Sequence, residues 1–598
     1  MRNGRFGRLL AGSLLAVTAM APMPGHAAPD RVLPAVPMPP AANAPQPAAT
    51  ELGMRGSLDQ FVPGNDVPVA ERLRTIISSK DIHRRIDWAP YRKEVERFYA
   101  ARHYAPVWVH DGALTARGKA VIARLRNAAA DGLDPADYPA PNFGSDPKAE
   151  MLAEGDIQIT NAVLDYARHL AVGRIAPRRV VSQIEYGDHT PDPAGILKTI
   201  TQARDINAAF DSFNPPDPGF RALKEKLAEL RRSSNDDTGN RIPAGPRIKP
   251  GTRDARIPML RARLHVRGRA HDTRYDRALY NVIRRVQRNA DLRPTGFIDS
   301  KTLAVINGPT HRQVIDTITA NMERWRWLPR DLGQTYVMVN IPDYTLKVVH
   351  DNRTVWHTKI VTGKPTTPTP LVSAPMKQVI VNPSWYVPQS IIQNELLPAY
   401  QSDPNIFDRM GLEVRQAPDG HINVVQPPGA ANALGRIKFV FPNKFQVYLH
   451  DTPEKRLFSY DRRAFSHGCM RVQDPTKFGE VMLSLAMDGR TPNARQLNSM
   501  FGREERDFKL AKQPMVHLTY QTAFVDDAGK LELRDDLYGI DARIHTIMHS
   551  AERRIADVPP PPDPKRDLAT LKSSQEILRR VERREAQNPI VFFERLFR

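Results

Sequence analysis

The sequence predicts a multidomain α+β protein with a helical scaffold, a small three-helix unit and a mainly β domain that carries a lid insertion. Up to about residue 309, apolar residues recur every three or four positions, which is typical of amphipathic helices. From residue 334 onward they alternate or form short runs between Gly and Pro turns, which is typical of strands. A length of 598 residues also indicates more than one domain.

The first 68 residues are predicted to lie outside the folded body. Residues 1–27 have the pattern of a secretory signal peptide, with arginines before an apolar stretch and the small-x-small sequence Gly25-His26-Ala27 at the cleavage point. Residues 28–68, which begin rich in Pro and Ala, are predicted to be a linker. We therefore expect an exported, periplasmic protein. The alternative is that residues 1–27 are not cleaved and remain as a membrane anchor. If they are cleaved, the protein is expected to contact the membrane only through the signal sequence before cleavage.

The composition narrows the classes of partner. A formal net charge of +20 favours attraction to an anionic membrane or envelope polymer, with an ordinary solvated basic surface as the alternative. No zinc-finger, RNA-recognition or basic-zipper pattern occurs, so nucleic acid is not an expected partner.

Two helical segments precede the strands. Residues 69–240 are predicted to form a helical scaffold domain, in which residues 159–172 make a strong amphipathic helix that Gly173 ends. Residues 252–309 are predicted to form three short helices. Their apolar spacing, with Gln287 and a turn at Gly296, resembles the peptidoglycan-binding domain that is often appended to cell-wall enzymes. A simple spacer module is the alternative.

The second half is predicted to begin with a helix over residues 310–333 that returns to the scaffold. Residues 334–545 are predicted to form the mainly β domain. Within it, residues 389–440 interrupt the strand pattern and are predicted to be a lid, because long insertions beside reactive segments often close over them. Residues 546–598 are predicted to be a flexible tail.

Cys469 is the only cysteine in the chain. It cannot form an internal disulfide, so in an exported protein it is either inert or retained for its chemistry. A reactive thiol needs a base or an imidazolium partner, and His450 lies nineteen residues earlier and His467 two residues earlier. The backbone N–H groups of Gly468 and Cys469 are candidate donors to an oxyanion. These residues predict a cysteine acyltransferase.

The segment Ser-His-Gly-Cys-Met-Arg-Val at 466–472, preceded by His450, resembles the signature of L,D-transpeptidases with the YkuD-type catalytic fold. The agreement extends upstream to residues 382–388 and downstream to 535–541. The order of scaffold, peptidoglycan-binding domain and catalytic domain resembles the large periplasmic members of this family. One departure is Gln473, which stands where the family often has Asn.

The resemblance implies a reaction and its partners. Cys469 is expected to attack the L,D-peptide bond of a peptidoglycan stem tetrapeptide and release D-alanine. The thioester is then transferred to a diaminopimelate amine of a second stem, which forms a 3→3 cross-link. The resemblance implies no cofactor and no metal, inactivation by carbapenems, and stem peptides as partners, with other cell-wall synthesis proteins as further candidates.

Eight residues are predicted to form the site. Cys469 and His450 are the catalytic pair, and Tyr448 shares a strand face with His450 because side chains on a strand alternate. Asp451 is expected to point to the other face, so a backbone carbonyl is the expected partner of the second ring nitrogen of His450. The remaining residues have two predicted roles: oxyanion or structural support from Ser466, His467 and Gly468, and substrate binding by Trp385, Tyr448 and Arg471, the last to a carboxylate.

Several alternatives remain open. His450, His467 and Cys469 form a conceivable zinc site, although no second cysteine or HExxH motif occurs. A papain-like protease would need a different cysteine context. With the same acyl-enzyme, water as acceptor gives an L,D-carboxypeptidase, and a protein amine gives wall-protein attachment or its reversal. The alternative that is not an enzyme is a non-catalytic wall-binding scaffold.

Overall fold

The computed structural model describes residues 58–559, except 87, 234–240, 270, 291 and 417–421. The predicted signal peptide, residues 28–57 of the predicted linker and residues 560–598 of the predicted tail lie outside this range. The predicted α+β fold class is confirmed, since a helical N-terminal region precedes a mostly β domain built on one curled sheet. Across the described residues, no helix has both the length and the apolarity that a bilayer crossing requires.

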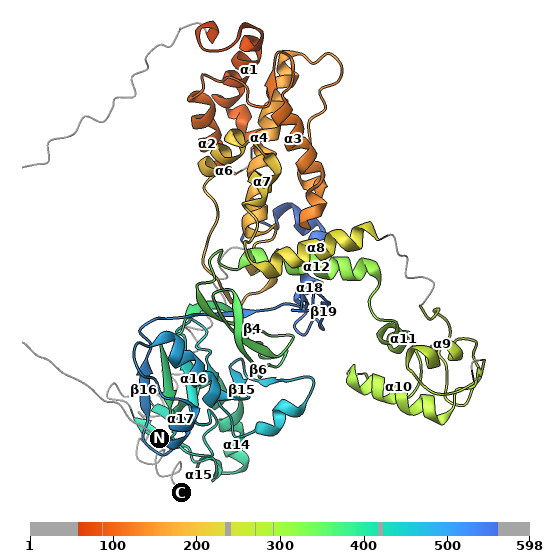
Figure 1. Ribbon diagram of the computed structural model, residues 1–598, viewed down its shortest axis with the longest axis vertical. Helices are drawn as coiled ribbons and strands as arrows, with labels where there is room; N and C mark the ends of the chain where they lie inside the picture. The colour runs from red at the N-terminus through yellow and green to blue at the C-terminus, as the bar shows by residue number, and fades with distance from the viewer. Residues whose placement is uncertain are drawn as a thin grey trace, which may run out of the picture. The chain divides into compact units, whose positions relative to one another are not determined.

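Helix α4 (Ala149–Val172) is the centre of the helical body (Figure 1). Most of its residues are buried, and α1, α3, α6 and α7 pack around it. It ends at Gly173, whose φ of +90° favours glycine, and a Cβ there would lie 2.5 Å from Glu323 Oε1. The other elements of this body are α1 (Val67–Ile77), α2 (Ala89–Ala100), β1 (Val109–His110), β2 (Ala113–Leu114), α3 (Ala116–Arg126), α5 (Pro177–Val180), α6 (Pro193–Gln202) and α7 (Ile206–Asp211).

The end of the predicted linker belongs to this helical body. Asp66 is buried, and its carboxylate accepts hydrogen bonds from the Asp111 N–H at 2.8 Å and from His110 Nδ1 at 2.7 Å. The predicted boundary at residue 68 is therefore too late, because a buried, bonded carboxylate fixes residues that the local composition marks as a linker.

Residues 242–307 form a three-helix unit with its own apolar core. Gln287 is buried at its centre, where its side-chain amide donates to the Phe297 carbonyl at 2.7 Å and accepts from the Gly296 N–H at 2.9 Å. Gly296 adopts a φ of +73°, which explains the glycine at this turn. The helices are α9 (Ile257–Arg263), α10 (Arg277–Asn289) and α11 (Ser300–Asn307).

A twelve-stranded sheet is built mostly from the second half of the chain. Helices α16 (Pro475–Ala486) and α17 (Ala494–Ser499) share a core with it, and the rings of Phe439 and Phe478 lie 4.3 Å apart. The strands, in pairing order, are β16 (Arg506–Lys509), β8 (Gln378–Val381), β12 (Ile437–Val440), β13 (Leu449–His450), β15 (Met470–Val472), β6 (Arg353–Gly363), β5 (Thr345–His350), β4 (Thr335–Asn340), β17 (Met515–Thr519), β7 (Leu371–Pro375) and β3 (Ile184–Glu185), while β14 (Ala464–Ser466) pairs with β6.

The predicted boundary between scaffold and sheet is also revised. Strand β3 lies in the segment predicted to be helical scaffold, yet it pairs with β7 of the large sheet. Helix α8 (Pro218–Arg232) packs on α12 (His311–Trp327) and on the hairpin of β18 (Ala523–Val525) and β19 (Leu531–Leu533). Segments that are far apart in the sequence therefore pack against each other. Periodicity within one segment cannot predict such contacts.

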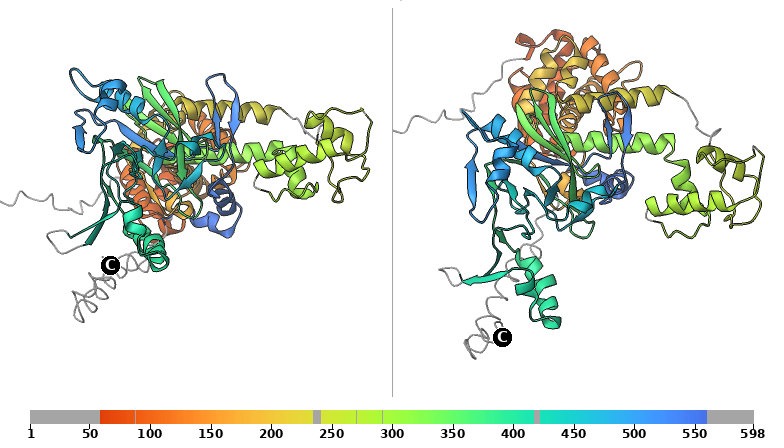
Figure 2. Two further views of the ribbon diagram at one scale, coloured as in Figure 1. Left: turned by 90° about the horizontal axis from the view of Figure 1, so that it is seen from below. Right: turned by 60° about the horizontal axis from the view of Figure 1, so that its bottom comes forward.

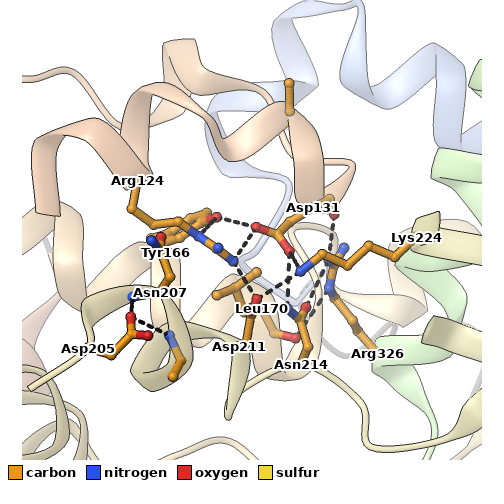
Figure 3. A network of polar contacts seen from close by, with 12 residues as sticks. Arg124, Asp131, Tyr166, Leu170, Asp205, Asn207, Asp211, Asn214, Lys224 and Arg326 are labelled. Atoms are coloured by element: carbon orange, nitrogen blue, oxygen red, sulfur yellow. Dashed lines mark hydrogen bonds and ion pairs between the residues drawn. The ribbon is translucent and has the colours of Figure 1, made fainter. Parts of the chain in front are cut away.

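Helix α12 joins the two regions through buried charges. Arg326 is 0 % exposed and donates to the carbonyls of Leu170 at 3.2 Å and Asp131 at 2.6 Å (Figure 3). On the sheet side, Arg324 donates to the Tyr520 carbonyl at 2.7 Å and pairs with Asp541. The one helix therefore bonds to the backbone of both regions.

The Asp131 carboxylate extends this junction. It is fully buried and contacts Arg124 and Lys224, each at 2.7 Å, and Tyr166 at 2.5 Å (Figure 3). Burial on its own raises the pKa of a carboxyl, but the two cations lower the pKa of Asp131 overall. Helices α3, α4 and α8 are thereby held to the turn that Arg326 contacts.

The beginning of the predicted flexible tail is folded onto the helical body. After α18 (Ile540–Met548), a 3₁₀ turn (Ala551–Ile555) leads to Asp557, which pairs with Arg168 at 2.5 Å and Arg174 at 3.5 Å. The Ala176 N–H also donates to the Ala556 carbonyl at 2.7 Å. A tail beginning at 546 is therefore wrong for residues 546–559, because partners almost four hundred residues earlier hold them.

The predicted lid is a small lobe with its own core. Its helices, teal in Figure 2, project away from the sheet, and Ile392, Leu396 and Val424 pack together inside it. The predicted end at 440 is wrong, since β12 belongs to the large sheet. The elements are β9 (Trp385–Tyr386), α13 (Gln389–Ile391), a π-helix (Ile392–Leu396), α14 (Leu397–Ser402), α15 (Ile406–Arg409), β10 (Glu413–Gln416) and β11 (Ile422–Gln426).

Replacing Arg326 by Leu is expected to lower the free energy of unfolding by about 3 kcal/mol, because two buried carbonyls lose their donor. Urea unfolding measures this. The control is Arg221→Leu, which removes an exposed arginine of α8 and is expected to change stability by no more than about 0.5 kcal/mol. Equal effects of the two substitutions would contradict a structural role for the α12 junction.

Candidate active site

Two adjacent strands place the predicted catalytic residues on one face of the sheet. β13 and β15 run parallel, with Leu449 beside Met470 and His450 beside Arg471. Leu449 and Met470 are fully buried in the core. Because side chains on a strand alternate, the neighbouring residues of each strand point to the opposite face. Tyr448 and His450 therefore share a face with Cys469 and Arg471.

This face opens onto a cavity of about 1020 Å³. Lid residues form the opposite wall, among them Ile391, Glu395 and Met410. The volume lies at the upper end of the usual range for ligand sites, which suits an extended ligand. Of the eight predicted site residues, seven line the cavity: Trp385, Tyr448, His450, Ser466, His467, Cys469 and Arg471.

Cys469 is partly buried and packs against the core of the sheet. Burial raises the pKa of its thiol to about 11, although hydrogen bonds from the backbone and side chain of Tyr448 and the charge of Lys438 oppose this. The Trp385 indole in turn donates to the Tyr448 hydroxyl. Hydrogen bonds thus run from Trp385 through Tyr448 to the sulfur and orient it. Because its pKa is raised, the thiol is uncharged near neutral pH.

His450 is also neutral. Its side chain is buried, and burial, followed by the charge of Arg471, lowers its pKa to about 3. Nδ1 lies 2.5 Å from the backbone carbonyl of Asp451, so Nδ1 carries the proton, and the ring also hydrogen-bonds to the backbone of Leu434. The Asp451 carboxylate bonds instead to the N–H groups of Arg436 at 2.8 Å and Thr452 at 2.7 Å. His450 is therefore a neutral imidazole rather than a preformed imidazolium, because burial and the charge of Arg471 disfavour its protonated form.

The loop before Cys469 has an internal hydrogen-bond network. Ser466 Oγ donates to the Cys469 carbonyl at 2.5 Å and accepts from the Gly468 N–H at 3.2 Å, and Thr369 Oγ1 donates to the Gly468 carbonyl at 2.8 Å. Gly468 has a φ of +118°, which favours glycine. Its N–H, a predicted oxyanion donor, is already bonded to Ser466. The Cys469 N–H thus remains the candidate donor, and Gly468 serves to shape the loop.

His467 contacts the lid. Its Nε2 lies 2.6 Å from Glu395 Oε1, and Glu395 belongs to the π-helix of the lid. π-Helical turns are rare and often mark functional positions. His467 therefore connects the cysteine loop to the lid, which the predicted supporting role did not specify.

Two further findings concern charged residues. Arg471, predicted to bind a substrate carboxylate, pairs with Glu454, so part of its guanidinium is already occupied.

Lys438 and Glu395 also line the cavity but were not identified from the sequence. A signal for Lys438 was available, since it is the one charged residue within the short apolar strand β12. For Glu395, no comparable signal exists because its partner is distant in the sequence.

The conceivable zinc site would need His450, His467 and Cys469 to converge on one metal ion. Within the part of the chain that the structure describes, no group of three or more His, Cys, Asp or Glu side chains is arranged to hold a metal ion. His450 and His467 instead direct nitrogens to the Asp451 carbonyl and to Glu395. The set proposed for zinc is thus not assembled.

Comparisons with known proteins identify two segments. Residues 93–227 match a family described as a scaffold domain, and residues 334–483 match the L,D-transpeptidase catalytic domain. A candidate L,D-transpeptidase of Haemophilus influenzae is 29 % identical over 257 residues, which cover 40 % of this chain and 51 % of the relative. The chain thus spans about half the length of this curated relative.

Solved structures give lower similarity. An L,D-transpeptidase from Mycobacterium smegmatis is 16 % identical, with a TM-score of 0.17 over 31 % of this chain and 58 % of that one. The catalytic domain of an L,D-transpeptidase from E. faecium is 16 % identical, with a TM-score of 0.14 over 31 % of this chain and 96 % of that one.

The raised pKa of Cys469 predicts slow alkylation at neutral pH. Since the thiolate is the nucleophile, the rate of modification by iodoacetamide is expected to keep increasing as the pH approaches about 11. Mass spectrometry of the Cys469 peptide measures this. Tyr448→Phe removes a donor to the sulfur and is expected to slow alkylation further. A rate that levels off near neutral pH would indicate a preformed thiolate instead.

The contact between Glu395 and His467 predicts that Glu395→Gln loosens the lid. Both side chains are partly exposed, so the pair contributes at most about 1 kcal/mol, and amide exchange in the π-helix is expected to accelerate up to about fivefold. Hydrogen-exchange mass spectrometry measures this. Glu413→Gln, which removes a lid carboxylate paired within its own strand, is the matched control. Unchanged exchange in Glu395→Gln would exclude a role for the pair in holding the lid.

Proposed function

From the catalytic-domain match over residues 334–483, we propose that this protein is a peptidoglycan L,D-transpeptidase with Cys469 as its nucleophile. The observation that carries the proposal is the arrangement of β13 and β15. It brings Cys469 and a neutral, tautomer-defined His450 to one face of a lidded cavity. The proposed substrates are stem peptides of peptidoglycan.

In the first half-reaction, Cys469 attacks the carbonyl carbon between the third and fourth residues of a stem tetrapeptide. His450 Nε2 accepts the thiol proton as the carbon–sulfur bond forms, which avoids a free thiolate in a buried setting. The Cys469 N–H stabilises the developing oxyanion. The carbon–nitrogen bond then breaks, the proton passes to the departing amine, and D-alanine leaves behind a thioester.

In the second half-reaction, the side-chain amine of diaminopimelate on another stem attacks the thioester. His450 accepts a proton from that amine and returns it to the departing sulfur, so the thiol is regenerated. The product is a 3→3 cross-link. No ATP is consumed, because the free energy of the original peptide bond is conserved in the thioester.

The acceptor distinguishes the nearest alternatives. Water in place of the amine gives an L,D-carboxypeptidase, and an amine of an envelope protein gives wall attachment. A lid that closes over a cavity of about 1020 Å³ favours the amine, because exclusion of water protects a thioester. A non-catalytic wall-binding scaffold would have no use for a base held beside a thiol.

The remaining parts of the chain are proposed to serve the same task. Export through residues 1–27 would bring the enzyme to the periplasm, and residues 252–309 would dock it on the wall. The helical scaffold is a candidate docking site for partner proteins. Other cell-wall synthesis proteins are the candidate partners. The net charge of +20 supports attraction to anionic envelope polymers.

Cys469→Ala is expected to abolish D-alanine release from a disaccharide tetrapeptide, because no other thiol exists in the chain. Mass spectrometry of the products also identifies the acceptor: a dimer indicates transpeptidation, a tripeptide indicates hydrolysis and a protein conjugate indicates attachment. His450→Gln, which retains a polar side chain of similar size, is expected to reduce release about a hundredfold or more. Unimpaired turnover by Cys469→Ala would refute the proposal.

A further inference from the structure

Lys438 lies beside the catalytic pair. On the antiparallel strands β12 and β13 it is directly opposite His450, which is itself beside Arg471 on β15. The three basic side chains thus form a row across the sheet, on the face that opens into the cavity. Lys438 is half-buried, and its Nζ lies 4.0 Å from the ring centroid of Tyr448.

The three members of this row differ in how their charge is satisfied. Arg471 pairs with Glu454 through Nη1, although its buried Nε has no hydrogen-bond partner among the described residues, and His450 is uncharged. Lys438 forms no ion pair with any residue that the structure describes. Its contact with the face of Tyr448 is a cation–π interaction, which leaves its N–H donors without an acceptor among those same residues.

This unpaired cation is costly to the protein. Burial lowers the pKa of Lys438 below its usual value, which shows that the charged form is disfavoured there. An anion entering the cavity would stabilise the charged form and provide acceptors for its donors. The position of Lys438 in the cavity therefore favours an anionic ligand.

We propose that Lys438 determines specificity by binding a carboxylate of the donor stem peptide beside Cys469. This inference rests on the proposed function. A tetrapeptide donor has two carboxylates near the scissile bond: the C-terminal carboxylate of the fourth residue and the side-chain carboxylate of diaminopimelate in the third. Both have the same chemistry, and the experiment below distinguishes them.

The spacing suits this role. The ammonium of Lys438 lies over the ring of Tyr448, and the sulfur of Cys469 accepts a hydrogen bond from the same side chain, so one tyrosine side chain spans the two groups. The two carboxylates belong to the residues on either side of the scissile carbonyl. Ion pairing at Lys438 would place that carbonyl at the sulfur.

The test measures binding in the full chain carrying Cys469→Ala, so that neither turnover nor the thiol contributes. Isothermal calorimetry gives the affinity for three tetrapeptides: the free acid, its C-terminal amide, and the form amidated at the diaminopimelate side chain. Each is measured with and without Lys438→Met, which keeps an apolar stem and removes the charge. The matched control is Lys359→Met, an exposed lysine on β6 outside the cavity.

Lys438→Met is expected to weaken binding of the free acid about tenfold to a hundredfold. The loss is expected to disappear for one amidated peptide, which identifies the carboxylate that Lys438 binds. Lys438→Arg is expected to restore much of the affinity, and Lys359→Met to change it less than about twofold. Unaltered binding of the relevant amide also shows that the Lys438→Met cavity is intact.

Equal losses for all three peptides, no loss for any, or no measurable binding of the free acid would each overturn the assignment of Lys438. The proposed function fails separately. If the chain with Cys469 intact releases no D-alanine while binding depends on Lys438 and a carboxylate, the transpeptidase proposal is wrong and the carboxylate site stands.

Discussion

The structure depends on the buried charges of α12. Arg326 is fully enclosed and hydrogen-bonds to the backbone of the helical body, while Arg324 bonds to the backbone of the sheet region. Buried charges of this kind need hydrogen-bond acceptors, and the Nε and Nη2 of Arg326 find theirs in backbone carbonyls of the helical body. The hydrogen bonds of Arg326 and Arg324 therefore hold α12 against both the helical body and the sheet region. As a result, the turn at Asp131 and the segment at Tyr520, which directly follows β17, cannot shift independently of α12.

Burial also decides the chemistry of the site. It raises the pKa of Cys469 and lowers that of His450, so both groups are neutral where an exposed pair could form a thiolate and an imidazolium. A neutral pair avoids the cost of two charges in a low-dielectric setting, provided that the proton moves as the substrate is attacked. The cation of Lys438 favours negative charge on the sulfur but opposes protonation of His450, so its effects on the two ends of that transfer oppose each other.

Much of this arrangement could be predicted from the chain itself. The change from helical to alternating periodicity distinguished a mainly helical region from a mainly β one, although it missed β3, which lies in the predicted scaffold and joins the sheet. The lone Cys469 with its two histidines identified the loop and strand that form one cavity wall. The alternation rule placed Tyr448 with His450 on one face and Asp451 on the other, and the carbonyl of Asp451 is the partner of the imidazole. These features are local, because spacing along one strand or helix determines them.

What the sequence by itself determined is therefore the class of most segments and the position of the lone thiol, the candidate nucleophile. Only the tertiary structure decided which distant residues meet. It paired β3 with the large sheet, held Asp557 against Arg168, and placed Glu395 of the lid beside His467. It also separated the roles of the two cations near the site by giving Arg471 a partner and leaving Lys438 without one among the described residues. The physical reason is that pairing across strands and burial of charge arise from contacts between segments, and neither periodicity nor spacing within one segment carries that information.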